Sequence, residues 1–119
     1  MPTMAVHPVP HPPRTLEIYF RIPDDGTPTL ICRGPITAEN SGLFKSEVKK
    51  WVPRSKLVIV DLSEVNYIDS SGLGTVLAAY ISAKAAGCDL KLINLSQRIK
   101  ELLHLTRLAA VFEGHGDSV

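Results

Sequence analysis

The stretch that decides the fold runs from Leu57 to Tyr80 and reads LVIVDLSEVNYIDSSGLGTVLAAY. Its first four residues form a continuous apolar run rich in β-branched side chains, which is typical of a strand buried on both faces. Further on, apolar residues recur at helical spacing, at Leu73, Val76, Leu77, Tyr80 and Ile81. The polar sequence Asp69-Ser70-Ser71-Gly72 therefore lies where the chain turns from a sheet into a helix.

This polar sequence has two possible uses, because a helix N-terminus offers free backbone N–H groups and the positive end of the helix dipole. In the first interpretation, Asp69 or Ser70 caps the helix, which is worth about 1 kcal/mol. In the second, Ser70 is an exposed phosphoacceptor whose phosphate the dipole stabilises, and the added charge expels a partner from a nearly neutral surface. Taken alone, the residues leave both interpretations open.

Composition restricts the class of protein. The chain has 119 residues, of which 45% are hydrophobic, and this suits one domain with one core. The net charge of +1 lacks the basic excess of a nucleic-acid-binding protein. No apolar run approaches the roughly 20 residues of a membrane helix, and the N-terminus lacks a signal-peptide pattern. We therefore expect a cytoplasmic protein that binds neither nucleic acid nor membranes.

The N-terminal half predicts a hairpin followed by a helix. Residues 15–22 alternate between apolar and polar, and residues 29–33 resume an extended run after a turn at Asp25-Gly26. Thr37 is a plausible N-cap for the helix, which Pro53 stops. The apolar positions of the first strand are expected on one half-buried face: Leu16, Ile18, Phe20 and Ile22.

The C-terminal half adds helices and a further strand. The helix from about residue 70 to 86 turns its apolar stripe toward the core, and its other side is small: Gly74, Thr75, Ala78, Ala79 and Ser82. A strand at residues 90–94 and a helix capped by Ser96 follow, and residues 108–112 form a last strand or docking turn. The order β-β-α-β-α-β-α predicts a single-domain α/β fold with a mixed sheet and helices mainly on one face.

The ends of the chain are expected to lie outside this domain, which we place at residues 15–113. Residues 1–14 are rich in proline and predict a flexible tail, and residues 114–119 predict a second flexible tail. His7 and His11 are interpreted as part of the first tail, because no third metal-ligand type is close to them in sequence.

Other chemistries lack their partner residues. A nucleophile elbow needs glycine two residues before Ser70, where this chain has isoleucine. Gly72 and Gly74 supply only half of a dinucleotide fingerprint. Cys32 and Cys88 are not spaced for zinc, and we expect free thiols. We predict no catalytic residue, no metal and no cofactor.

The sequence YIDSSGLG at residues 67–74 follows a VDLS strand end and precedes a helix that Gly87 closes. In this pattern the chain resembles the STAS domain, and most closely the bacterial anti-sigma-factor antagonists, from about residue 15 to 112. The resemblance implies that Ser70 is phosphorylated by a partner serine kinase that is also the anti-sigma factor. The unphosphorylated antagonist binds this kinase and frees the sigma factor, and phosphorylation releases the antagonist.

The resemblance also implies the residues that contact the partner: Asp69, Ser71, Gly72, Gly74 and Thr37. Asp69 would help to position or activate the serine, and Thr37 stands where members of the family often have Asp. A phosphatase acting on Ser70 is a further implied partner. Such a protein is a substrate and binding partner rather than an enzyme, and ATP belongs to the kinase.

Two other functions stay open. The first is a STAS module that binds a nucleotide, lipid or anion at the same helix N-terminus. The second is a scaffold subunit of a signalling assembly that is never phosphorylated. Ser70 beside Asp69 favours the switch, because a pure scaffold would not require both residues.

Overall fold

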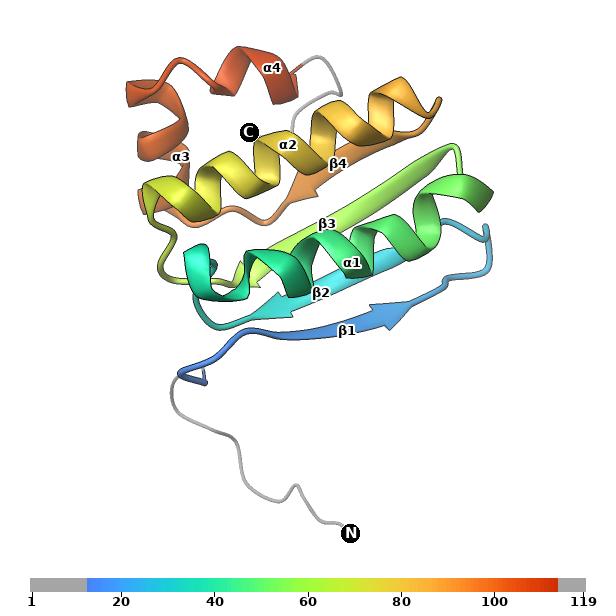
Figure 1. The fold of residues 1–119 in the computed structure, drawn as a ribbon, viewed down its shortest axis with the longest axis horizontal. Coiled ribbons are helices and arrows are strands. Elements are labelled where there is room, and N and C mark those ends of the chain that lie inside the picture. Colours follow the sequence, from blue (N-terminus) through green and yellow to red (C-terminus); the bar gives the residue numbers. More distant parts are fainter. Residues whose placement is uncertain (1–12, 114–119) are drawn as a thin grey trace, which may run out of the picture.

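The computed structural model describes residues 13–113, so His7, His11 and almost all of the two expected tails lie outside the described residues. Four strands form one sheet in the order β1-β2-β3-β4: β1 Glu17–Arg21, β2 Thr29–Arg33, β3 Leu57–Glu64 and β4 Asp89–Ile93. β1 is antiparallel to β2, whereas β2, β3 and β4 are parallel to one another. The prediction of an α/β fold with a mixed sheet is confirmed (Figure 1).

The expected turn joins β1 to β2. Gly26 adopts a φ of +82°, and its N–H donates to the carbonyl oxygen of Pro23 at 2.8 Å. Asp25 stabilises the same turn, because its Oδ1 accepts the N–H of Thr27 at 2.9 Å. An Asp-Gly pair therefore reverses the chain as the sequence predicts.

Four α-helices and two short 3₁₀ helices complete the described residues: η1 Ala38–Asn40, α1 Ser41–Trp51, η2 Val52–Arg54, α2 Ser70–Ala85, α3 Gln97–Leu105 and α4 Ala109–Glu113. Figure 1 shows α1 and α2 side by side over the same face of the sheet. At the end of α2, Gly87 has a φ of +83°, and its N–H donates to the carbonyl oxygen of Lys84 at 3.0 Å. The predicted C-terminus of this helix is therefore confirmed.

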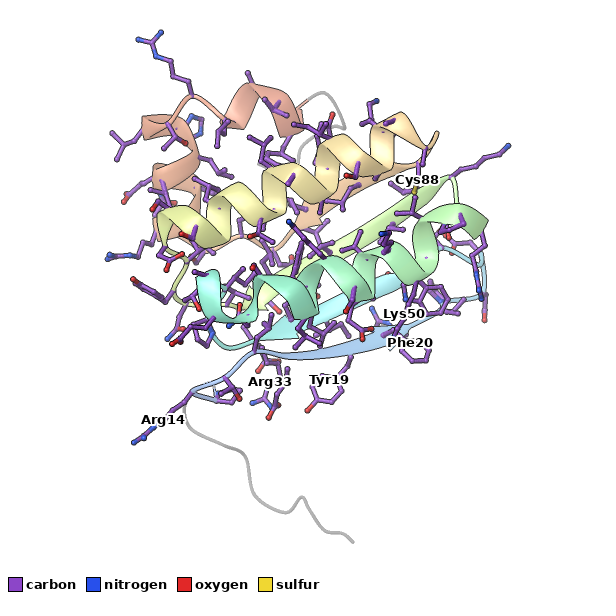
Figure 2. All side chains as sticks on the ribbon, in the orientation of Figure 1. Arg14, Tyr19, Phe20, Arg33, Lys50 and Cys88 are labelled. Atoms are coloured by element: carbon purple, nitrogen blue, oxygen red, sulfur yellow. The ribbon has the colours of Figure 1, made fainter. Side chains whose placement is uncertain are left out.

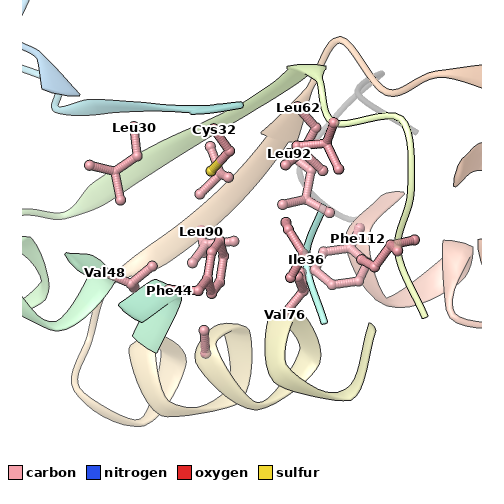
Figure 3. Packing of buried hydrophobic residues seen from close by; sticks show 14 of the residues in the cluster. Leu30, Cys32, Ile36, Phe44, Val48, Leu62, Val76, Leu90, Leu92 and Phe112 are labelled. Atoms are coloured by element: carbon pink, nitrogen blue, oxygen red, sulfur yellow. The ribbon is translucent and has the colours of Figure 1, made fainter. Parts of the chain in front are cut away.

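The core lies between these helices and one face of the sheet (Figure 3). Alternate residues of the strands form the sheet side of the core: Leu30, Cys32, Val58, Val60, Leu62, Leu90 and Leu92. Phe44 and Val48 of α1 and Val76 of α2 cover them. Leu57 and Ile59 point to the opposite face and are only partly buried. The expectation that residues 57–60 are buried on both faces of the sheet is therefore wrong, because the helices cover only one face.

The buried face of α2 also differs from the prediction. Ile81 is 57% exposed, whereas Thr75 and Ala79, which we expected on the opposite side, are buried. The helix is rotated so that Thr75 and Ala79 face the core, while Gly74 and Ser82 stay exposed. The larger Ile81 is left in solvent.

The two ends of the domain hold the remaining differences. Phe20 and Ile22 are 61% and 49% exposed, so only the start of the first strand is buried as expected. Residues 109–113 form α4 rather than a strand, and the ring of Phe112 packs edge-on against Tyr80 with 5.0 Å between centroids. Two consecutive alanines at the start of this segment favour the helix.

Candidate functional site

Asp69 fixes the start of α2. Its backbone is extended, with φ −95° and ψ 179°, and its Oδ1 accepts the N–H of Gly72 at 2.6 Å. Its carbonyl oxygen accepts the N–H of Leu73 at 2.8 Å. The predicted cap is therefore formed by Asp69, and this leaves the hydroxyl of Ser70 free for another use.

The loop before α1 holds this cap in place. The N–H of Ile36 donates to the carbonyl oxygen of Tyr67 at 3.1 Å, and the N–H of Asp69 donates to the carbonyl oxygen of Ile36 at 3.4 Å. Ile36 and Ile68 form an isolated parallel bridge. The ends of β2 and β3 are thus tied together directly beneath the first turn of α2.

Gly72 makes this close approach possible. A Cβ atom at this position would lie 1.9 Å from the carbonyl oxygen of Ile36, far inside van der Waals contact. Gly72 is buried, whereas Gly74 is exposed and a Cβ there would meet nothing within 4 Å. The two glycines of the motif therefore differ, because only Gly72 is required by packing.

Ser70 is the first residue of α2 and is exposed. Within residues 13–113, its side chain makes no hydrogen bond, and the N–H groups of Ser70 and Ser71 have no protein acceptor. Ser71 is exposed too, and its carbonyl oxygen accepts the hydroxyl of Thr75 at 2.9 Å. The surface thus presents a free hydroxyl beside two unsatisfied donors, and no acidic residue lies in the first turn itself.

Thr37 lies directly after Ile36, at the edge of the same surface. Its N–H donates to the Oδ1 of Asn40 at 2.9 Å, and the Nδ2 of Asn40 donates to the carbonyl oxygen of Pro35 at 2.9 Å. Thr37 therefore precedes η1, whereas α1 itself begins after Asn40, three residues later than the predicted N-cap. Through Ile36, the structure brings Thr37 to the loop that carries Asp69.

Sequence reasoning assigns no role to Ile36, which is the residue that joins the two loops. Its backbone makes both of the loop contacts, and its side chain is fully buried. Backbone contacts of this kind depend on how neighbouring strands end. The one available signal was Gly72, a residue that disfavours helix interiors and therefore needs a packing reason.

The thiols contribute nothing to this surface. Cys32 and Cys88 are both free and buried. Burial, with a smaller contribution from the charge of Asp61, raises the pKa of Cys32 to about 12. Burial and then the charge of Asp89 raise the pKa of Cys88. Among the described residues, no group of three or more His, Cys, Asp or Glu side chains could hold a metal ion.

Residues 23–118 match the STAS domain. The chain belongs to the STAS domain family. It is 32% identical over 85 residues to the anti-sigma-B factor antagonist of Listeria monocytogenes, a match that covers 71% of this chain and 75% of the relative. It is 38% identical over 80 residues to the anti-sigma-B factor antagonist of Bacillus subtilis, covering 67% of this chain and 73% of that one.

The fold of this STAS domain also matches solved structures. An anti-sigma factor antagonist from Mycobacterium paratuberculosis aligns with a TM-score of 0.72 at 20% identity, covering 86% of each chain. At this identity the likeness shows the fold alone. Within the described part of the chain, no helix is both long and apolar enough to span a bilayer.

Proposed function

We propose that this STAS protein is an anti-sigma-factor antagonist, switched by phosphorylation of Ser70. In this proposal the unphosphorylated chain binds an anti-sigma factor that is also a serine kinase, and so frees a sigma factor. The curated relatives at 32% and 38% identity are named anti-sigma-B factor antagonists, which supports the assignment. The observation that carries the switch is the exposed, unbonded hydroxyl of Ser70 at the N-terminus of α2.

Phosphorylation fits this position without a change of fold. The kinase transfers the γ-phosphoryl group of ATP to the Oγ of Ser70, and ADP and the hydroxyl proton leave. The phosphate then lies near the free N–H groups of Ser70 and Ser71, where the helix dipole favours negative charge. Because Asp69 already caps the helix, the hydroxyl is not needed for stability.

The same modification opposes binding of the partner. The phosphate adds a charge of about −1.5 to −2 beside Asp69. In the unmodified state, where Ser70 is uncharged, the partner covers this surface. A kinase surface that accommodates Asp69 and an uncharged serine meets repulsion and a desolvation cost when the phosphate is present. Release therefore needs no rearrangement of the antagonist.

The remaining site residues divide by role. Ser71 and Gly74 line the contact surface from the start of α2, and Thr37 lines it from the loop before η1. Because Gly72 has no side chain, the first turn of α2 packs directly against Ile36. Asp69 positions Ser70 by capping that turn. The chain acts as substrate and not as enzyme, and a phosphatase acting on Ser70 completes the cycle.

The experiment combines the purified protein, ATP and each candidate serine-kinase anti-sigma factor of the source genome, and maps phosphate by mass spectrometry. We expect one phosphate, on Ser70. Ser70→Ala should abolish the signal, and Ser46→Ala, at an exposed serine of α1, is the control that should retain it. A kinase that binds the protein tightly but leaves Ser70 unmodified would refute the switch.

A further inference from the structure

β1 is an edge strand whose outer side has no partner among residues 13–113. Natural edge strands are usually protected by lysine, proline or a β-bulge. The strand reads EIYFR and contains neither lysine nor proline, and its two charged residues, Glu17 and Arg21, lie at its ends. Its pairing with β2 runs without a register shift from Glu17 opposite Arg33 to Arg21 opposite Thr29. A regular row of backbone donors and acceptors therefore faces outward.

Large apolar side chains gather at this edge. Tyr19 is 51% exposed, Phe20 is 61% exposed and Ile22 is 49% exposed. Figure 2 shows Tyr19 and Phe20 extending from β1 away from the rest of the sheet. Phe20 lies on the helix side, where its ring is 5.2 Å from that of Trp51, so Tyr19 points to the opposite face. Both faces of the edge thus offer apolar area to a partner strand.

We propose that this edge binds a second copy of the chain, with the two β1 strands antiparallel about a twofold axis at Tyr19. Glu17 then lies opposite Arg21 of the second copy, and Arg21 lies opposite Glu17 of the second copy. Between them, Ile18 faces Phe20 and the two Tyr19 side chains meet. The two sheets become one, and opposite charges pair twice.

The charges select this register. An axis at Ile18 would place Glu17 opposite Tyr19, and an axis at Phe20 would place Arg21 opposite Tyr19. Neither alternative pairs the two charges with each other. An axis between two residues is excluded because paired side chains share one face of an antiparallel sheet.

Both charged groups are available for this contact. Within the described residues, Arg21 has no ion-pair partner. Glu17 lies 3.5 Å from Arg33, a guanidinium whose closer partner is Glu64 at 2.8 Å. The Tyr19 hydroxyl also donates to the Oε1 of Glu17 at 2.9 Å, an exposed hydrogen bond. The contact with the second copy would therefore replace a long, partly exposed ion pair and compete with this hydrogen bond.

The dimer does not interfere with the proposed switch. Ser70 follows β3, and β2 lies between β3 and β1, so the phosphoacceptor stays open in the dimer. A strand pair of this length is a small interface, typical of weak and concentration-dependent association. We therefore expect monomer and dimer to exchange.

Analytical ultracentrifugation of the full chain at low salt tests this proposal. The apparent mass should rise with concentration from 13.0 kDa toward twice that value. Arg21→Glu and Glu17→Arg each place like charges opposite one another twice, so each should raise the dissociation constant at least about tenfold. An equimolar mixture of the two variants should restore dimers, because their charges are complementary. Arg98→Glu, an exposed residue of α3, is the matched control and should dimerise like the wild type.

Several outcomes would overturn the proposal. One is a chain that is monomeric at all concentrations, and another is single variants that dimerise as well as the wild type. Hydrogen exchange adds a separate reading, because the outward amides of β1 should become protected only as concentration rises. Protection at every concentration in a monomer would show that the chain's own N-terminal segment occupies the edge.

Discussion

At the scale of single residues, the geometry of the site depends on the absence of a side chain at Gly72. The carbonyl oxygen of Ile36 occupies the position where a Cβ atom would lie. Gly74, two residues further along α2, is also a helical glycine, but a Cβ atom there would meet only open space. The two positions therefore form a natural pair for measurement.

Gly72→Ala should lower the free energy of unfolding by about 3 kcal/mol or more, because the methyl group forces the two loops apart. Gly74→Ala should raise it by up to about 1 kcal/mol, since alanine favours the helix. Urea denaturation followed by circular dichroism measures both. Equal effects of the two substitutions would show that the contact with Ile36 does not constrain α2.

Cys32 should make stability depend on alkaline pH. Its pKa is raised to about 12 in the folded protein, whereas an exposed thiol ionises near 9.0. As pH rises above 9, the unfolded chain loses this proton first, so stability falls by up to about 1.4 kcal/mol per pH unit until about pH 12. Cys32→Ala should have a shallower slope between pH 9 and 10.5 in denaturant unfolding. An unchanged slope would contradict a protonated thiol in the core.

At the scale of elements, α2 begins at a cap whose charge and shape can be separated. Asp69→Ala should cost about 1 kcal/mol of stability, because the N–H of Gly72 loses its acceptor. Asp69→Asn keeps an acceptor and should cost less. Thermal unfolding of both variants provides the measurement. A loss as large for Asn as for Ala would mean that the charge, and not the hydrogen bond, stabilises the helix start.

The sequence predicts where most elements lie but not how they are rotated. Local chemistry predicts the strand before Asp69, the cap of α2 and the end of α2 at Gly87, and all three are present. Apolar residues occur on most sides of α2, so spacing alone could not show that Ala79 is buried and Ile81 exposed. Tertiary packing makes that choice, because α2 lies beside α1 over the sheet and Ala79 is part of the core below them.

At the scale of the whole molecule, the sheet follows from the order of elements. A helix between two strands predicts a parallel pair, and β2, β3 and β4 are parallel as expected. The last segment could not be assigned, because five residues carry too little periodicity to separate a strand from a helix. Tertiary packing decides its form, since Phe112 is buried against Tyr80.

Phe112→Ala should therefore lower the free energy of unfolding by about 3–5 kcal/mol, because it leaves a cavity beside α2. Leu105→Ala is the control, since Leu105 is 82% exposed, and its effect should stay within about 0.5 kcal/mol. Denaturant unfolding of the two variants measures both changes in the free energy of unfolding. A small effect at Phe112 would show that α4 is not part of the cooperative fold.

The central claim is that phosphorylation of Ser70 releases a kinase that is also an anti-sigma factor. Isothermal titration of this kinase with the unmodified and the phosphorylated protein tests it most directly. We predict that phosphorylation weakens binding at least about 100-fold, or about 2.7 kcal/mol, because of the added charge beside Asp69. Ser70→Ala should bind as tightly as the unmodified protein, with or without ATP. Equal affinities of the kinase for the two forms of the wild-type protein would contradict the account.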